Sequence, residues 1–142
     1  MSPDVFGRSL SGFGVNLLVR NIAKACHFAH EVFGATIVHH DENFAYVVRG
    51  DAHDRYGWQY HVDQTYHAHP LFGIVTTAQG RGIGVELRLY DCDPDRAVSQ
   101  AQIHDYIILA KALDKPHGLR EAYILDADGY CWVPSTPREI TR

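Results

Sequence analysis

A short segment occurs twice in this chain of 142 residues, and the repetition constrains the fold more than any other feature. The first copy is Gly14–Asn21 and the second is Gly84–Asp91, 70 residues further along. Both copies start at glycine, carry apolar residues at the third and fifth positions after it, and end at Asn or Asp, which suits a helix N-cap. The repeat predicts a tandem duplication of one module, and the two modules must share a core because about 70 residues alone bury too little surface.

The first module is expected to span residues 14–77. Gly14–Arg20 is predicted as a strand, and Asn21 is predicted to cap a helix whose apolar residues recur at steps of three and four. Gly34 is the predicted end of that helix. The two β-branched runs that follow predict a hairpin.

The second half of the first module is less regular. Residues 51–69 are polar and aromatic with little periodicity, so we interpret them as a long loop insertion. Leu71–Val75 is predicted as the fourth strand, and residues 78–82 as a Gly-rich linker.

The second module, residues 84–134, repeats the same order. Asp93 and Pro94 predict a helix start, and the helix is expected to end near His104. Three further strands are expected at 106–110, 120–125 and 130–133, the last two joined by the turn Asp126–Gly129. The chain is therefore predicted to be one domain of two βαβββ modules.

Composition and charge exclude several classes of function. The net charge is −4 without a cluster of Lys or Arg, so no electrostatic basis for nucleic-acid binding is present. The sequence has neither an apolar run of about 20 residues nor the pattern of a signal peptide, so we expect no membrane partner and a cytoplasmic location. Three cysteines without a C-x-x-C pair favour reduced thiols over a disulfide framework.

Three segments in this order resemble the vicinal oxygen chelate superfamily, which includes glyoxalase I, the bleomycin- and fosfomycin-resistance proteins and the extradiol dioxygenases. The segments are Val19–Gly34, Gly84–Asp93 and Gly118–Tyr130. The resemblance implies an α+β fold in which two tandem βαβββ modules form curled mixed sheets around a cavity, with the helices on the outer face. It also implies that the cavity binds a small molecule, usually beside a divalent metal.

The metal-ligand positions of this superfamily do not carry ligands in the present sequence. The histidine that begins the first strand of each module corresponds to Gly14 and Gly84, and the glutamate of the final strand corresponds to Val133. No acidic residue lies in residues 71–77 to match the fourth ligand. Because the usual site needs imidazoles and carboxylates that converge on one ion, we expect no glyoxalase-type metal and no other cofactor.

Strand alternation predicts which side chains line the cavity instead. If Leu17, Val19, Leu87, Leu89 and Trp132 pack toward the helices, the alternate residues point into the cavity. These are Asn16, Leu18, Glu86, Arg88, Cys131 and Val133. Asn16, Glu86, Arg88 and Cys131, with His69 from the loop, form the predicted ligand-binding set. Glu86 and Arg88 alternatively form a structural ion pair or a dimer contact.

Other side chains leave alternatives open. His67 and His69 lie on one side of an extended segment and, with His61, His39 and His40, allow a divalent metal site, although solvated loop histidines are the simpler interpretation. Cys131 is either a nucleophile or a packed small side chain. The aromatic residues Tyr56, Trp58, Tyr60 and Tyr66 form either a lid over a flat ligand or a dimer interface.

Two functional hypotheses follow. The first is a metal-free protein, similar to the bleomycin-resistance branch, that binds a small polar or aromatic molecule. The alternative is a lyase, isomerase or dioxygenase-type enzyme with a relocated site, in which Glu86 acts as the catalytic base. In either case a homodimer is expected, because members of this superfamily pair modules within or across chains.

Overall fold

Each module folds as a strand, a helix and three strands, and each forms its own four-stranded sheet. The structure is a computed structural model that describes residues 2–139. The first part contains α1 (Pro3–Ser9), β1 (Asn16–Val19), α2 (Ile22–Phe33), β2 (Thr36–His40), β3 (Phe44–Arg49), β4 (Tyr56–Val62) and α3 (Phe72–Val75). The second part contains β5 (Glu86–Leu89), α4 (Pro94–Ile103), β6 (Ile107–Asp114), β7 (Leu119–Leu125) and β8 (Cys131–Pro137).

The two sheets have the same topology, which confirms the predicted duplication of an α+β module. Their strand orders are β1-β4-β3-β2 and β5-β8-β7-β6. In each sheet the first strand pairs parallel with the last, and the other pairs are antiparallel. The registers correspond as well, since Asn16 lies opposite Gln59 and Glu86 lies opposite Cys131. Neither sheet closes into a barrel.

The helices begin and end at the residues that the sequence indicates. The Asn21 side chain accepts a hydrogen bond from the Lys24 backbone N–H at the start of α2, and Gly34 ends that helix with a φ of 69°. Asp93 caps α4 in the same way, with Pro94 as the first helical residue. His104 is the C-cap of α4.

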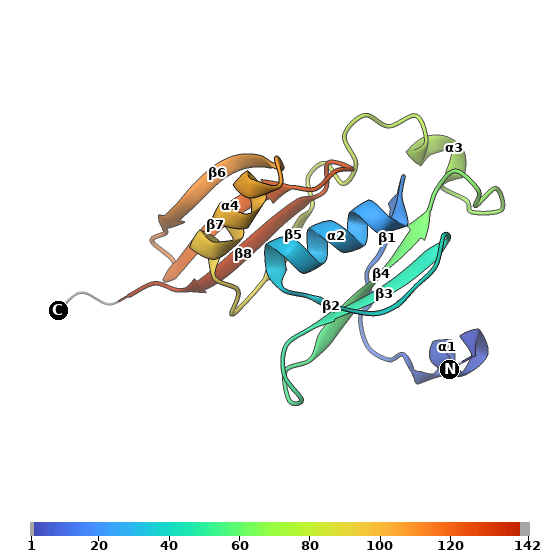
Figure 1. The fold of residues 1–142 in the computed structure, drawn as a ribbon, viewed down its shortest axis with the longest axis horizontal. Coiled ribbons are helices and arrows are strands. Elements are labelled where there is room, and N and C mark those ends of the chain that lie inside the picture. The colour runs from blue at the N-terminus through green and yellow to red at the C-terminus, as the bar shows by residue number, and fades with distance from the viewer. Residues whose placement is uncertain (1, 140–142) are drawn as a thin grey trace.

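The core lies between the sheets and the helices. Helix α2 packs against β2, β3 and β4, α4 packs against β6, β7 and β8, and the two helices contact each other. Figure 1 shows the two modules side by side, with α2 and α4 on the same side of the sheets. Leu17, Val19, Leu89 and Trp132 are buried in this core and Leu87 packs against it, as strand alternation predicts.

Three segments differ from the sequence-based expectation. Residues 56–62, predicted within a loop, form strand β4 in the centre of the first sheet. Leu71–Val75, predicted as the fourth strand, contains the short helix α3 instead, because β4 already occupies the place between β1 and β3. Helix α1 was not predicted, although Ser2 caps it and Pro3 is its first residue.

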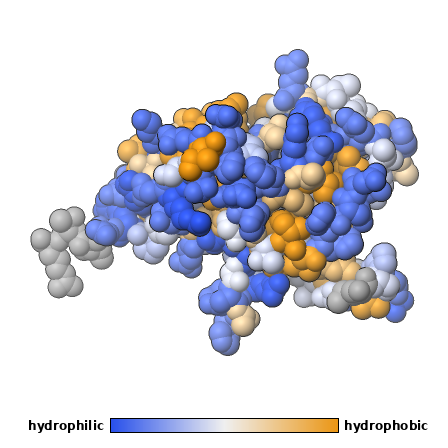
Figure 2. Space-filling view, viewed as in Figure 1, coloured by the Kyte–Doolittle hydropathy of each residue, from blue (hydrophilic) through white to orange (hydrophobic). Residues whose placement is uncertain are grey.

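The surface is mixed. Figure 2 shows hydrophilic side chains over much of the viewed face, with the hydrophobic ones in separate patches. No helix within residues 2–139 is long and apolar enough to cross a membrane. All three thiols, Cys26, Cys92 and Cys131, are free, as their spacing predicts.

Candidate ligand groove

A groove with a volume of about 640 Å³ lies where the two modules meet. Its walls come from both halves of the duplication, namely the starts of β1 and β5 and the adjacent strands β4 and β8. The residues that line it are Phe13, Gly14, Val15, Asn16, Leu17, Tyr56, Gly57, Trp58, Gly82, Val85, Glu86, Leu87, Arg88, Leu89, Tyr130, Cys131 and Trp132. Most of this lining is apolar, with Glu86 and Arg88 as its charged members.

Four of the five residues predicted to bind a ligand meet in this groove. Asn16 comes from β1, Glu86 and Arg88 from β5, and Cys131 from β8. The fifth, His69, does not line the groove, because the loop after β4 carries it elsewhere, where its Nδ1 accepts a hydrogen bond from the Leu71 backbone N–H. Leu18 and Val133, which strand alternation also assigned to the cavity, are buried and lie outside the groove lining.

Arg88 joins two carboxylates on the face of the second sheet that lies opposite α4. Its Nη1 donates a hydrogen bond to Glu86 Oε1 at 2.9 Å, and its Nη2 donates one to Glu121 Oε2. Glu121, from β7, is only 2% exposed and also accepts a hydrogen bond from the Tyr123 hydroxyl at 3.2 Å. The His117 ring contacts the same carboxylate at 3.3 Å.

This network controls the ionisation of its buried members. Burial by itself raises the pKa of Glu121, but the hydrogen bond and positive charge of Arg88 outweigh it and hold the pKa below its usual value. Burial by itself lowers the pKa of Arg88, but the hydrogen bond to Glu121 outweighs this effect and raises the pKa above its usual value. The pair is therefore an ionised salt bridge. The sequence did not reveal Glu121 as part of the site, since nothing in its local pattern marks a buried glutamate.

Aromatic rings form much of the groove wall. Trp58 and Trp132 lie with their ring centroids 5.1 Å apart, and Tyr56 stacks against Trp58 at 6.4 Å with an interplanar angle of 28°. Neither alternative for the aromatic set, a lid or a dimer interface, fits Trp58 and Tyr60, because they belong to strand β4 and are 4% and 0% exposed. Tyr66 lies instead over His61, with the ring centroids 5.3 Å apart.

On the first sheet, aromatic rings occupy part of the face away from α2. Phe44 and Tyr46 alternate with the buried residues Ala45 and Val47, so they point to this face. Phe6 of α1 packs edge-on against both rings, with centroid distances of 5.9 and 4.9 Å. The N-terminal helix thus covers part of the surface that corresponds to the Arg88 network in the second module.

Asn16 connects this covered face to the groove. Its Oδ1 lies 2.9 Å from His61 Nδ1, so a neutral His61 with its proton on Nδ1 donates to the amide oxygen. Burial, followed by repulsion from His69, lowers the pKa of His61. The neutral form of His61 is therefore the one that holds Asn16 in place.

The residues at the metal-ligand positions of the superfamily do not fit a metal. Gly14 and Gly84 have no side chain, and Gly84 has a φ of 87°, a backbone conformation that a histidine rarely adopts. Within residues 2–139 no group of three or more His, Cys, Asp or Glu side chains is arranged to hold an ion. His67 and His69, like His61, His39 and His40, belong to no such group among these residues.

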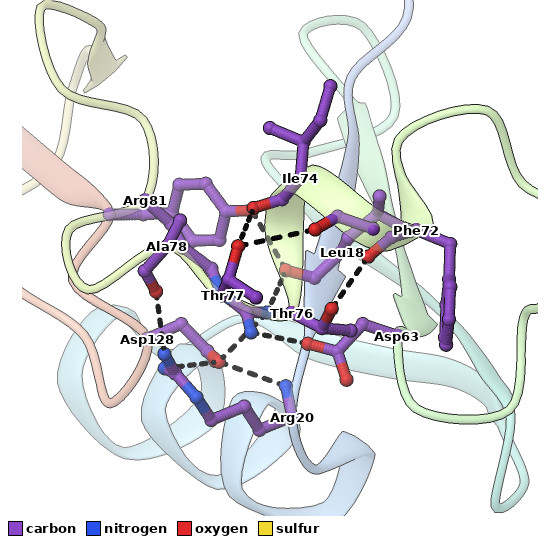
Figure 3. A network of polar contacts seen from close by, with 12 residues as sticks. Leu18, Arg20, Asp63, Phe72, Ile74, Thr76, Thr77, Ala78, Arg81 and Asp128 are labelled. Atoms are coloured by element: carbon purple, nitrogen blue, oxygen red, sulfur yellow. Dashed lines mark hydrogen bonds and ion pairs between the residues drawn. The ribbon is translucent and has the colours of Figure 1, made fainter.

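A buried polar clamp around Arg81 joins the two modules (Figure 3). Arg81, from the linker, pairs with Asp63 after β4, and its Nη1 lies 3.5 Å from Asp128 Oδ1 in the β7–β8 turn. The same Nη1 donates to the Leu18 carbonyl at 2.9 Å, and the Tyr130 hydroxyl donates to this oxygen at 2.8 Å. Arg81 is 3% exposed, so its side chain anchors a linker that the sequence indicated only by its glycines.

The turn residues behind the groove have the role that the sequence predicts. Asp126 Oδ1 accepts hydrogen bonds from the backbone N–H groups of Asp128 and Tyr130, and its Oδ2 accepts one from Trp132 Nε1. Burial raises the pKa of Asp126 to about 6. Asp126 thereby holds the Trp132 ring, which is part of the groove wall.

The fold is shared with solved structures of low sequence identity. A glyoxalase-related enzyme from Fulvimarina pelagi superposes with a TM-score of 0.66 at 18% identity, over 89% of this chain and 88% of that chain. The fosfomycin resistance protein FosX from Mesorhizobium loti gives 0.60 at 14% identity over 91% and 94%. TioX from Micromonospora sp. ML1 gives 0.61 at 16% identity over 93% and 100%.

These similarities confirm the predicted fold, which glyoxalase/bleomycin resistance/dioxygenase proteins among the neighbours share. No protein-family model and no curated protein matches the sequence.

Proposed function

We propose that this protein binds a small, partly aromatic molecule in the groove between its two modules and that binding needs no metal ion. The observation that carries the proposal is the convergence of Asn16, Glu86, Arg88 and Cys131 on one groove whose wall contains both tryptophans of the chain. An apolar, aromatic wall with a few polar groups is typical of small-molecule sites.

The arrangement of charges supports binding over catalysis. A general base must take up a proton, and a cation in contact with a carboxylate stabilises the ionised form and opposes that step. Glu121, which contacts Arg88, has a lowered pKa and is buried, and Glu86 Oε1 already accepts the hydrogen bond from Arg88. Cys131 does not suit a nucleophilic role, because burial raises the pKa of its thiol.

Metal independence is supported by the ligand positions. Glycine at 14 and 84 and valine at 133 leave no imidazole or carboxylate at three places where the metalloenzymes of this superfamily carry one. We therefore expect an added chelator to leave binding unchanged.

A thermal-shift screen tests the proposal. Val85 lines the groove and is 54% exposed, so Val85→Trp fills the site without disturbing the core. A compound that raises the Tm of the wild type by about 3 °C should have no effect on this variant. Val38→Trp is the matched control, because Val38 is 52% exposed and lies on β2 away from the groove. Equal stabilisation of both variants would contradict the proposal.

We also propose that the chain forms a homodimer through β6. This strand is the outer edge of the second sheet, and Ile107, Leu109 and Leu113 on it are 55–61% exposed. A long apolar edge strand favours association with another chain. Light scattering after size exclusion should give a dimer for the wild type and for Val38→Lys, and a monomer for Leu109→Lys. A monomeric wild type would refute this part of the proposal.

A further inference from the structure

The Arg88 network beside the groove contains one more carboxylate than guanidinium. Of the residues that line the groove, only Glu86 and Arg88 are charged, and Arg88 is shared with the buried Glu121. Two carboxylates therefore surround one guanidinium. Because two carboxylates already contact Arg88, its positive charge is offset and offers an anionic ligand little net attraction.

The two carboxylates differ in how much hydrogen-bonding capacity they have left. Glu121 is 2% exposed and accepts hydrogen bonds from Arg88 and Tyr123. The Glu86 side chain is 46% exposed, and among the described residues its recorded partner is Arg88, at Oε1 alone. Glu86 Oε2 is thus the acceptor that the groove offers to a ligand.

A neighbouring thiol lies within reach of the Glu86 charge. Cys131 lies opposite Glu86 in the β5–β8 register. Burial raises the pKa of its thiol first, and the negative charges of Glu86 and Asp126 raise it further. A negative potential at the groove surface disfavours an anion there and favours a cation.

The aromatic wall lies next to this acidic group. Trp132 follows Cys131 directly on β8, and its ring lies 5.1 Å from that of Trp58. Tyr56 is 36% exposed and Phe13 is 93% exposed, so ring surface is accessible to a ligand. A cation beside aromatic rings is stabilised by their negative faces as well as by the carboxylate.

We propose that the groove selects ligands that carry a protonated amine on a short stem from an aromatic ring, with Glu86 Oε2 as the acceptor for the ammonium group and the exposed rings of Tyr56 and Phe13 as the contact for the ligand ring. This inference rests on the proposed function of the groove as a ligand site.

Three probes with the same ring but different charge test the inference, namely 2-phenylethylamine, 2-phenylethanol and phenylacetate. Emission from Trp58 and Trp132 reports on the groove, because these are the two tryptophans of the chain and both line it. Titrations at about pH 8 keep the amine protonated and free histidine neutral. The amine should bind about tenfold more tightly than phenylacetate, with the alcohol between them.

The variant Glu86→Gln should weaken amine binding about tenfold and leave the alcohol unchanged. Glu42→Gln is the matched control, since it removes the same charge from the exposed β2–β3 turn and should change nothing. Equal binding of amine and phenylacetate, or tighter binding of phenylacetate, would overturn the cation inference while the groove remains a ligand site. Failure of all three probes to alter the emission would count against both proposals.

Discussion

Arg88 on β5 forms a salt bridge across the second sheet with Glu121 on β7, a carboxylate that is only 2% exposed. The strand between them, β8, carries Cys131 and Trp132 of the groove. The side chain of Arg88 thus fixes the position of Glu86 at the groove while it neutralises a charge that the sheet buries. Binding geometry and stability are coupled in this residue.

The first prediction concerns that coupling. Arg88→Met leaves Glu121 buried without its cation and should lower the free energy of unfolding by about 2 kcal/mol. The double variant Arg88→Met/Glu121→Met should recover most of the loss, because no isolated charge remains. Urea unfolding of the four proteins of the cycle measures this. Arg120→Met is the control, because Arg120 also binds two carboxylates, Asp95 and Asp114, but these lie on the exposed surface. This substitution should therefore lower the free energy of unfolding only slightly.

The second prediction concerns the clamp between the modules. Arg81→Met leaves Asp63 and Asp128 without their buried cation and should cost about 3 kcal/mol in urea unfolding. Arg20→Met is the comparison, because Arg20 contacts the same Asp128 but its side chain is 42% exposed, so its loss should cost no more than about 1 kcal/mol. Equal costs for the two variants would show that the clamp does not hold the modules together.

The third prediction concerns helix α1. Phe6→Ala removes two edge-on ring contacts, with Phe44 and Tyr46, and should cost about 1 kcal/mol of stability. Val5 lies on the same helix and is 53% exposed, so Val5→Ala should have almost no effect on stability. If thermal unfolding distinguishes neither variant from the wild type, α1 does not pack on the first sheet in solution.

The fourth prediction concerns the pH dependence of the first module. Burial and then repulsion from His69 lower the pKa of His61, with Asp41 as the opposing charge. The folded state therefore binds fewer protons than the unfolded state, so this group reduces stability as the pH falls through about 6.5. NMR titration should give a His61 pKa below that of a free histidine, and His69→Gln should raise it. A wild-type pKa at or above the free value would contradict the packing of this site.

Much of the fold is predictable because its signals are local. Asn21, Gly34, Asp93 and Pro94 mark the ends of the two long helices through backbone hydrogen bonds and conformations that few other residues favour. The repeat of Gly14–Asn21 then implies the second module. Each of these inferences depends only on residues adjacent in the chain.

The errors arise where a local signal is weak or outweighed. Residues 56–62 do alternate between large apolar and smaller or polar side chains, which is a strand pattern, but their histidine and glycine content resembles a loop. Leu71–Val75 is an apolar run too short to distinguish a strand from a helix by period. Ser2 and Pro3 gave a helix start that the rest of the N-terminal segment does not reinforce.

The site is predictable only in part. Strand alternation assigns each side chain to a face of the sheet, but it does not identify the residue that the side chain contacts. Asn16, Glu86, Arg88 and Cys131 do line one groove, but this groove is also lined by residues that strand alternation assigned to the core, namely Leu17, Leu87, Leu89 and Trp132. The contact between Arg88 and Glu121 joins residues 33 positions apart, and the clamp of Arg81 joins three segments. Such contacts depend on how the sheets curve and how the modules pack, which no local pattern encodes.

The most direct test of the groove as a ligand site is a map of amide chemical-shift changes on addition of 2-phenylethylamine to the assigned protein. The account predicts that the largest changes cluster at residues 13–17, 56–58, 85–89 and 130–132, from both modules. Changes that cluster instead on the Phe6, Phe44 and His61 face of the first sheet, or that scatter over the surface, would contradict it.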